Sequence, residues 1–259
     1  MSDTFISLNP KRDVALFDLD GTVLDTYAPI LESMRYATKT VFGEALPDSK
    51  LVSMVGQPLV TQMQAFAAER GCGLEVADEL TRVYREYNER DLDEKSFPFP
   101  GIPEAIASLK NAGFTVGVVT SKRAALATKS LKAHGLFDAF ACVNGAEDST
   151  AHKPDPDPLL TAAKKLGVSP DRCVYVGDSP YDLQAAHAAN MPSVGVTWGK
   201  FFGRDILLEQ MPSVLIASPE ELVGAVELAA VRRRGRSARL NLLRFVKEPV
   251  NAIGSAEVR

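Results

Sequence analysis

The sequence is poor in cysteine and histidine, and this scarcity disfavours two classes of site. The 259-residue chain holds three cysteines, Cys72, Cys142 and Cys173, an odd number without a C-x-x-C pair. Cys142 and Cys173 lie in apolar runs, which favours a role in core packing over a disulfide or a thiolate site. The three histidines share no spacing typical of metal ligands, which argues against a zinc site. These counts predict a reduced protein.

Long hydrophobic runs are also missing from the sequence. No apolar stretch approaches the roughly 20 residues that a membrane-spanning helix needs. The first residues lack the positive region and apolar run of a signal peptide, so we expect a cytoplasmic protein. Hydrophobic residues make up 46% and charged residues 24%, which is ordinary for a globular protein and excludes disorder as the main state. The length suits one large α/β unit or a core with a smaller second domain.

Positive charge is outnumbered by negative charge everywhere except at the C-terminus. The net charge is −4, yet residues 231–259 contain eight Arg or Lys and two Glu, so this segment carries +6 and the body −10. An acidic body gives no general basis for nucleic-acid binding. We predict that residues 231–259 form a basic extension, with contact to an anionic membrane or a nucleic acid as the alternative to a segment without a role. The sequence indicates no oligomeric state.

Short apolar runs alternate with amphipathic segments along most of the chain. Continuous apolar strands that alternate with helices are typical of a parallel sheet covered on both faces. The sequence therefore predicts an α/β fold with a Rossmann-like, doubly wound parallel sheet. The predicted strands are Val14–Leu19, Thr115–Val119, Ala139–Val143, Arg172–Val176, Ser193–Val196 and Ser213–Ile216.

One segment interrupts this alternation, because between Tyr27 and Ser96 only helical patterns occur. A βα crossover needs far fewer residues, so the segment predicts a small all-α cap domain rather than helices that pack on the sheet. The proline-rich FPFPG at 97–101 marks the return to the sheet. The predicted division is 1–24 and 98–230 for the α/β core, 25–97 for the helical cap and 231–259 for the extension.

Two carboxylates, Asp18 and Asp20, end the first predicted strand in the stretch VALFDLDGT. Side chains alternate along a strand, so both lie on one side with Cα atoms roughly 6.5 Å apart. Buried carboxylates at this separation repel each other, and each loses hydration. The stretch alone leaves two interpretations open: a strand that ends in a solvated Asp-Gly turn, or a cation site or acid/base pair.

Further polar residues stand at the end of this strand, at the ends of other predicted strands or just before helices. They are Thr22, Thr120 and Ser121, Lys153, and Asp178, Ser179 and Asp182. Ligands of open parallel sheets bind at the carboxyl ends of the strands, so we expect these side chains to converge. Three carboxylates imply a hard divalent cation such as Mg²⁺. A hydroxyl, a lysine and helix N-terminal amides suit a phosphate group.

In their order along the chain, these segments resemble the four motifs of the haloacid dehalogenase (HAD) superfamily. The motifs are DLDGT at 18–22, the strand end at Thr120, Lys153 before PDP, and GDSPYD at 177–182. The helical insertion after the first motif is similar to the superfamily's smaller helical cap. The resemblance spans about residues 12–230, and four motifs in order are far more specific than any one alone.

The resemblance implies roles for the carboxylates. Asp18 corresponds to a nucleophile that forms an aspartyl-phosphate, and Asp20 to the general acid, and later base, of the reaction. Asp18, the main-chain carbonyl of Asp20, and Asp178 would hold Mg²⁺. Asp182 and Ser179 would stand behind these ligands, Asp182 by holding metal-bound water. The alternative for Asp178 or Ser179 is a helix N-cap.

The resemblance also implies how phosphate is bound. Thr120 would donate a hydrogen bond to phosphate, and Lys153 would neutralise the charge of phosphate and nucleophile together. The alternatives are a strand-end turn for Thr120 and a solvated surface lysine for Lys153. The other implied phosphate-binding residues are Gly21, Thr22, Ser121 and, from the cap, Gly56.

Within the resemblance, Asp20 favours phosphatases and phosphomutases over other reactions of the superfamily. Haloacid dehalogenases lack an aspartate at this position, and P-type ATPases carry threonine there. The stretches DGTVLDT, FPGIPEAIASLKNAG and SPEEL are similar to the phosphoglycolate phosphatase-like subgroup. This implies a Mg²⁺-dependent phosphatase that hydrolyses a small, phosphoglycolate-like phosphate monoester through an aspartyl-phosphate. The alternatives are a pyrophosphatase and β-phosphoglucomutase-like phosphoryl transfer. MVGQPLVTQ at 54–62 holds no basic residue, which favours hydrolysis over the mutase.

Two interpretations without catalysis stand beside the phosphatase. A receiver-like signalling domain also gathers aspartates, a hydroxyl and a lysine, but its acceptor lies on a later strand and it is roughly half as long. A catalytically silent module that binds phosphate or metal is disfavoured by the intact motif set. The cap is expected to select the leaving group. The candidate residues that face the site are Thr26, Tyr27, Gly56, Gln57 and Arg123.

Overall fold

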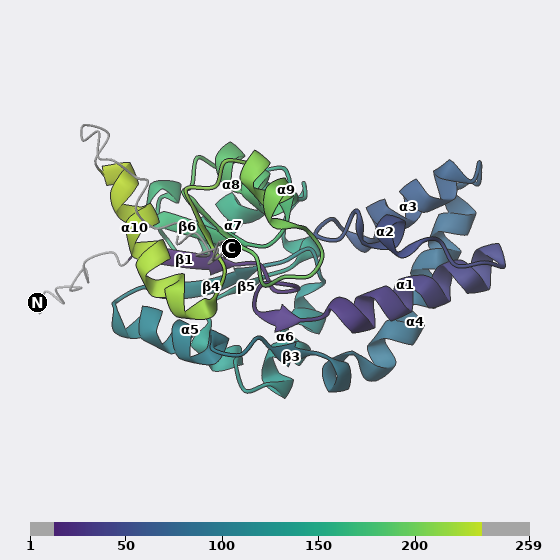
Figure 1. The fold of residues 1–259 in the computed structure, drawn as a ribbon, viewed down its shortest axis with the longest axis horizontal. Coiled ribbons are helices and arrows are strands. Elements are labelled where there is room, and N and C mark those ends of the chain that lie inside the picture. Colours follow the sequence, from purple (N-terminus) through teal and green to yellow (C-terminus); the bar gives the residue numbers. More distant parts are fainter. Residues whose placement is uncertain (1–12, 235–259) are drawn as a thin grey trace, which may run out of the picture.

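The computed structural model describes residues 13–234, which are built around one six-stranded sheet (Figure 1). The strand order is β5-β4-β1-β6-β7-β8, and all neighbouring strands are parallel. The central strand β1 pairs Val14 with Thr115 on one side and with Cys173 on the other. The strands are β1 Val14–Phe17, β4 Thr115–Val119, β5 Val143–Asn144, β6 Cys173–Gly177, β7 Ser193–Val196 and β8 Val214–Ile216. The predicted doubly wound parallel sheet is confirmed.

Helices cover both faces of the sheet, and every residue of β1 is apolar and buried. An all-apolar strand is stable only when both of its faces are covered. Ala15 and Phe17 join the apolar cluster of one set of helices, and Val14 and Leu16 join the cluster of the other. The first set is α5 Ile102–Asn111, α6 Ala124–Ala133 and α10 Leu222–Arg234; the second is α7 Asp157–Lys165 and α8 Pro180–Ala188. The short helix α9, Arg204–Glu209, connects β7 to β8. Each large side chain buried here contributes about 1.5–3 kcal/mol.

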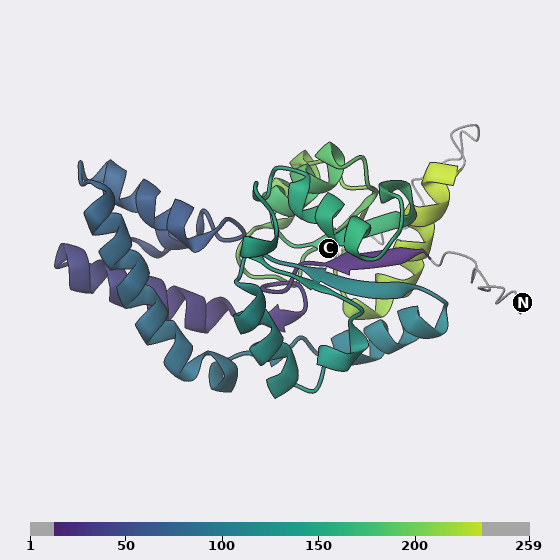
Figure 2. The ribbon, with the colours of Figure 1, turned by 180° about the vertical axis from the view of Figure 1, so that it is seen from behind.

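Four helices inserted after β1 form a cap with an apolar cluster of its own, which includes Met34, Leu51, Met63 and Phe66. They are α1 Tyr27–Phe42, α2 Asp48–Val52, α3 Leu59–Glu69 and α4 Leu74–Lys95. The chain enters and leaves the cap through a two-stranded antiparallel stem, β2 Leu24–Asp25 and β3 Phe97–Pro98. Figure 2 shows β1 running toward the cap, so the carboxyl end of the sheet and the cap face each other.

The predicted strand at Ala139–Val143 is wrong in its extent. Phe137–Ala139 is a 3-10 turn, and β5 comprises only Val143–Asn144. The amides of Ala139 and Phe140 donate to carbonyls three residues earlier, at 3.0 and 3.1 Å, so they are not available to a neighbouring strand. The apolar run instead buries Phe140 in the core as part of this turn. The other 3-10 turns are Ala146–Asp148, Pro170–Arg172 and Pro219–Glu221.

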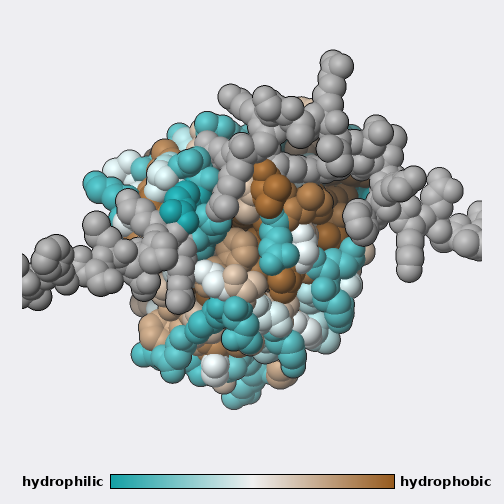
Figure 3. All heavy atoms as spheres, turned by 90° about the vertical axis from the view of Figure 1, so that its left-hand side faces the viewer, coloured by the Kyte–Doolittle hydropathy of each residue, from teal (hydrophilic) through white to brown (hydrophobic). Residues whose placement is uncertain are grey.

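The surface of the described residues bears on the predictions about membranes and the basic extension. Among residues 13–234, no helix is both long and apolar enough to cross a lipid bilayer. Figure 3 shows the end of the molecule away from the cap, where apolar residues gather among hydrophilic ones. Helix α10 ends the described part at Arg234, so most of the predicted basic extension, with its predicted contacts, lies outside the described residues.

Candidate active site

Asp18 follows β1 directly, at the edge of the sheet that faces the cap. Its N–H donates to the Val176 carbonyl of β6 at 2.9 Å, so its main chain is still held by the sheet. Only 4% of Asp18 is exposed. Asp20 is less buried, and its Oδ1 lies 2.7 Å from the ammonium of Lys122. The two carboxylates that end the strand therefore have different surroundings, and each has a lysine partner.

Lys153 is the lysine partner of Asp18 and is itself almost fully buried, with 2% exposed. Its Nζ lies 2.7 Å from Asp18 Oδ1 and 2.6 Å from Asp182 Oδ1, and it donates to the Tyr175 hydroxyl at 3.1 Å. Burial by itself would lower the pKa of Lys153, but the charges of Asp18 and Asp182 outweigh it and hold that pKa well above its ordinary value. Lys153 is therefore a fixed positive charge beside Asp18.

Asp182 connects Lys153 to the start of α8. Its Oδ2 accepts the Ser179 N–H at 3.0 Å and the Ser179 hydroxyl at 2.6 Å, while Ser179 Oγ accepts the Asp182 N–H at 3.2 Å. This is a capping box, so Ser179 has the helix-capping role that the sequence left open. The predicted role of Asp182 in holding metal-bound water stays a prediction, because its contacts here are with Lys153, Ser179 and Tyr175.

Asp182→Asn is expected to lower the free energy of unfolding by about 3 kcal/mol, since it removes one charge of a buried ion pair. The amide nitrogen of the asparagine is a donor, and it would face another donor, either the Lys153 ammonium or the Ser179 N–H, so one hydrogen bond would be lost. Urea unfolding followed by circular dichroism measures the change. Asp205→Asn is the control: Asp205 lies exposed in the first turn of α9, and its loss should stay within about 0.5 kcal/mol. Equal stability of both variants would contradict this role of Asp182.

Asp178 is enclosed by two segments of main chain. Its Oδ1 accepts a hydrogen bond from the Thr22 hydroxyl at 2.9 Å. A Cβ at Gly21, where φ is +88°, would lie 2.2 Å from Asp178 Oδ2, and a Cβ at Gly199 would lie 2.3 Å from the same oxygen. Only glycine permits this approach at both positions. The glycine of the first motif therefore makes room for the carboxylate of the last.

The three buried carboxylates of Asp18, Asp178 and Asp182 fit a divalent cation. Each offers an oxygen, and these oxygens all lie within 4.8 Å of one another. Burial, with the neighbouring carboxylates, raises the pKa of Asp18 to about 7 although Lys153 opposes this, and it raises the pKa of Asp178 well above its ordinary value. A divalent ion would favour the ionised forms of these carboxylates: three carboxylates and one ammonium then sum to −2, which the ion neutralises. Oxygen donors suit a hard cation.

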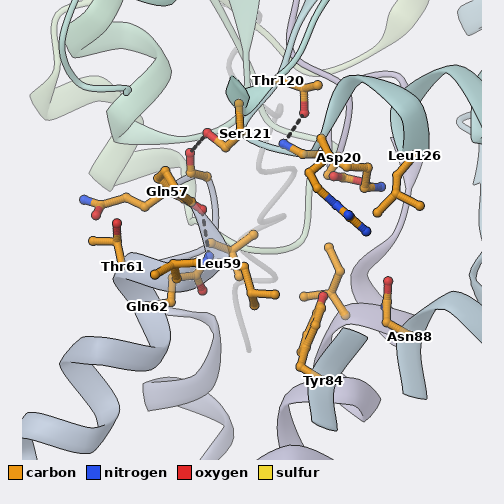
Figure 4. Close-up of a pocket in the computed structure, with 18 of the residues that line it drawn as sticks. Asp20, Gln57, Leu59, Thr61, Gln62, Tyr84, Asn88, Thr120, Ser121 and Leu126 are labelled. Atoms are coloured by element: carbon orange, nitrogen blue, oxygen red, sulfur yellow. Dashed lines mark hydrogen bonds and ion pairs between the residues drawn. The ribbon is translucent and has the colours of Figure 1, made fainter. Parts of the chain in front are cut away.

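A cavity of about 430 Å³ lies between this edge of the sheet and the cap (Figure 4). From the core it is lined by Asp18, Asp20, Thr120, Ser121 and Lys122, among others. The Ser121 hydroxyl donates to the Gly56 carbonyl of the cap at 2.7 Å and so links the two parts. Thr120 Oγ1 accepts the Lys122 N–H at 3.2 Å, the local turn that was the alternative for this residue. Thr120 nevertheless lines the cavity beside Asp18.

The sequence profile of haloacid dehalogenase-like hydrolases matches residues 15–196. The chain belongs to this family. A phosphoglycolate phosphatase from Shigella boydii serotype 4 is 31% identical over 236 residues, covering 84% of this chain and 93% of that protein. A protein from Caldanaerobacter subterraneus subsp. tengcongensis, provisionally named pyrophosphatase PpaX, is 33% identical over 217 residues, covering 84% and 96%.

Solved structures agree with this assignment. A structure from Clostridium acetobutylicum, described as a predicted phosphatase, superposes with a TM-score of 0.75 at 28% identity and covers 84% of this chain and 99% of its own. A hydrolase from Pseudomonas syringae gives 0.75 at 25% identity, with 83% and 98% covered. This HAD-like hydrolase is an enzyme of the phosphatase type, and the family implies a small-molecule phosphate substrate. The receiver-domain alternative is wrong.

The residues expected to contact the leaving group divide into two sets. Those that line the cavity of this HAD-like hydrolase are Gly56, Gln57 and Arg123. Thr26 and Tyr27 do not line it, and the prediction for these two is wrong. Thr26 is fully buried just before α1, and the ring of Tyr27 packs on Phe201 with 5.3 Å between centroids. Both residues belong to the junction of cap and core.

Three residues of the site were missed at the level of sequence: Lys122, Tyr175 and Gly199. Lys122 follows a predicted strand end in TSK, and this position was a usable signal. Tyr175 stands in the middle of an apolar strand, where an aromatic residue indicates core packing, yet its hydroxyl contacts Lys153 and donates to the Val119 carbonyl at 3.0 Å. Gly199 comes from a segment with no motif, so only the fold brings it to Asp178.

Proposed function

We propose that this hydrolase is a Mg²⁺-dependent phosphatase that acts on a small phosphate monoester through an aspartyl-phosphate on Asp18. The observation that carries the proposal is the position of Asp18, which lines the cavity while Lys153 holds its Oδ1 at 2.7 Å. Among the described residues, no hydrogen-bond donor occupies Asp18 Oδ2, so one carboxylate oxygen is free to attack. Covalent catalysis of this kind divides one difficult displacement into two easier ones.

In the first step, an oxygen of Asp18 attacks phosphorus, and the bond between phosphorus and the ester oxygen breaks. Asp20 gives its proton to that leaving oxygen. In the second step, Asp20 takes a proton from the water that attacks the aspartyl-phosphate, which releases inorganic phosphate and restores the Asp18 carboxylate. Lys153 neutralises charge on the phosphoryl group in both steps, and Thr120 would donate a hydrogen bond to it.

The proposed Mg²⁺ ligands are Asp18, Asp178 and the main-chain carbonyl of Asp20, with Asp182 and Ser179 behind them. A metal ion at this position would neutralise the charge of the phosphate and of the attacking carboxylate. Thr22 and Gly21 hold and accommodate the Asp178 carboxylate. The cluster of three buried carboxylates, whose oxygens lie within 4.8 Å of one another, supports a divalent cation here.

The names of the relatives supply two substrate candidates. The relative named phosphoglycolate phosphatase supports a phosphoglycolate-like monoester, and the provisional pyrophosphatase supports pyrophosphate as the alternative. Two further alternatives are β-phosphoglucomutase-like phosphoryl transfer and a catalytically silent phosphate- or metal-binding module. Assays of phosphate release test both of them. The cytoplasmic location of the enzyme stays a prediction.

Asp20→Asn tests the two-step scheme. It is expected to lower kcat for an alkyl phosphate by about 10²–10⁴-fold, because an amide cannot protonate the leaving oxygen. p-Nitrophenolate leaves without a proton, so this variant should still be phosphorylated by p-nitrophenyl phosphate and then hydrolyse slowly. A burst of nitrophenolate with an amplitude close to the enzyme concentration measures phosphorylation. Acid quenching then traps the phosphoenzyme for detection.

Asp25→Asn is the matched control, because Asp25 follows in the same stretch but pairs at the surface with Lys200 at 2.6 Å. Its kcat should stay within about twofold of the wild type. Loss of turnover on both substrates in Asp20→Asn, without any burst, would contradict the acid/base role of Asp20. No turnover of any phosphate by the folded wild type would contradict the proposed function.

A further inference from the structure

The cavity is larger than a glycolate leaving group requires. Its volume of about 430 Å³ lies within the range of roughly 300–1,000 Å³ that is typical of small-molecule pockets. Asp18 and Asp20 mark the end at which the phosphate would bind. A two-carbon leaving group would therefore fill only the space next to these aspartates, and most of the cavity toward the cap would remain for other groups.

Most of the exposed surface of the cavity wall is apolar, although six polar or charged residues also line it from the cap: Gln57, Thr61, Gln62, Arg85, Asn88 and Glu89. Met34 of α1, Leu59 of α3 and Tyr84 of α4 line it from three different cap helices, and Leu126 of α6 lines it from the core. Figure 4 shows Leu59, Tyr84 and Leu126 around the same space below Asp20. Such walls stabilise apolar groups that leave water, at about 25 cal/mol per Å² buried. They offer little to a strongly hydrated carboxylate or second phosphate.

The charges on the cavity wall are largely paired within the protein. Lys122 pairs with Asp20, and Arg123 pairs with Glu89, each at 2.7 Å. Among the lining lysines and arginines of residues 13–234, only Arg85 has no ion-pair partner. A pyrophosphate would bring a second, multiply charged group into this wall. One unpaired arginine is a poor match for that group.

Tyr84 adds a hydroxyl group to the apolar part of the wall. Its side chain is 9% exposed, and within the described chain its hydroxyl has no hydrogen-bond partner. Figure 4 shows the ring extending from α4 into the cavity, toward Asp20. Burial, and then the charge of Asp20, raises the pKa of Tyr84, so the hydroxyl stays neutral. A hydroxyl that faces the cavity without a protein partner is a free hydrogen-bonding group for a ligand.

Resting on the proposed phosphatase function, we propose that the substrate is a phosphate monoester whose leaving alcohol has an alkyl or aryl body larger than glycolate. The body lies between Leu59, Tyr84 and Leu126, and a polar substituent on it pairs with the Tyr84 hydroxyl. This substrate class fills the cavity, uses its apolar walls and requires no further cation. It is different in size and polarity from phosphoglycolate and pyrophosphate.

A series of ethyl, butyl and hexyl phosphate tests the proposal, because the leaving alcohols have nearly equal acidity and differ mainly in apolar surface. Each fully buried methylene contributes about a fourfold gain in affinity. The proposal predicts that kcat/KM rises at least about tenfold from ethyl to hexyl phosphate, and that hexyl phosphate exceeds phosphoglycolate. A flat or falling series, or a phosphoglycolate kcat/KM tenfold above that of hexyl phosphate, would overturn it.

Leu59→Asn locates the effect, with Leu74→Asn as the matched control. Both leucines are the first residue of a cap helix, but Leu74 is 68% exposed and does not line the cavity. Leu59→Asn should reduce the hexyl-to-ethyl ratio of kcat/KM at least threefold, while Leu74→Asn should leave the ratio at its wild-type value. An equal hexyl-to-ethyl ratio in both variants would show that the alkyl chain of the substrate binds elsewhere. It would overturn the proposal that Leu59 contacts this alkyl chain.

Binding of ethyl- and hexylphosphonate, measured by calorimetry, separates this proposal from the proposed function. Phosphonates carry a carbon–phosphorus bond that the proposed reaction does not cleave, so their Kd reports the cavity alone. A Kd at least tenfold lower for hexylphosphonate supports the apolar pocket, whereas equal values overturn it. If p-nitrophenyl phosphate is hydrolysed but the Kd values are equal, the substrate class is wrong and the phosphatase function stands.

Discussion

Asp18→Asn is expected to lower kcat by about 10⁴-fold or more and to leave no detectable phosphoenzyme. The amide cannot attack phosphorus as the carboxylate does, and no other carboxylate that lines the cavity holds the same position relative to Lys153. Lys153 would keep Asp182 as its partner at 2.6 Å, so the site should stay assembled. Turnover of p-nitrophenyl phosphate and acid-quench trapping of phosphoenzyme measure the effect.

The controls for this experiment separate chemistry from folding. Asp25→Asn, at the surface pair with Lys200, should retain wild-type kcat within about twofold. Far-UV circular dichroism of Asp18→Asn should match that of the wild type. If Asp18→Asn retains a kcat near that of the wild type, the nucleophile lies elsewhere and the proposed mechanism is wrong.

Removal of divalent metal is expected to have the second-largest effect. A chelator in excess should lower kcat by about 10³-fold or more, since a bound metal ion supplies several kcal/mol of charge stabilisation to phosphoryl transfer. Added Mg²⁺ should restore the rate. The expected cause is the group of Asp18, Asp178 and Asp182, whose oxygens lie within 4.8 Å of one another and would hold the ion next to the phosphate. Full turnover in the presence of excess chelator would contradict the metal assignment.

Metal binding can also be measured without turnover. Mg²⁺ at 100 times its Kd should raise the free energy of unfolding by about 2.7 kcal/mol, because the folded state alone assembles the carboxylates. Asp178→Asn removes one of these ligands and should lose most of this gain. The exposed Asp205→Asn variant should keep it in full. A gain that is the same in both variants would place the ion away from Asp178.

The sequence by itself determined the family, the parallel sheet and the inserted helices, for a local physical reason. The all-apolar strand Val14–Phe17 can be stable only with both faces covered, and that requirement is written in consecutive residues. The motif residues Asp18, Thr120 and Asp178 each follow a strand end, so topology alone brings them to one edge. The 27–95 segment is too long for a crossover, which made a separate helical unit predictable.

Only the tertiary structure decided which partners these residues have. Lys122 meets Asp20 from 102 positions away, and Lys153 joins Asp18 to Asp182 across separations of 135 and 29. No periodicity encodes such a pair, because the distance between two side chains depends on the packing of every element between them. The hydrogen bonds of Tyr175 were not predictable for the same reason. An aromatic residue in a buried strand gives the same sequence pattern whether or not its hydroxyl forms hydrogen bonds.

The shape of the cavity was likewise decided in three dimensions. Leu59, Tyr84 and Leu126 have unremarkable helical spacing in the sequence, and they become one apolar wall only because three helices from two parts of the chain meet there. Thr26 and Tyr27 stand next to the first motif in sequence, yet the start of α1 turns them into the junction and away from the cavity. Catalytic chemistry depends on residue types at strand ends and was readable from the sequence, whereas substrate choice depends on how separate surfaces pack against each other.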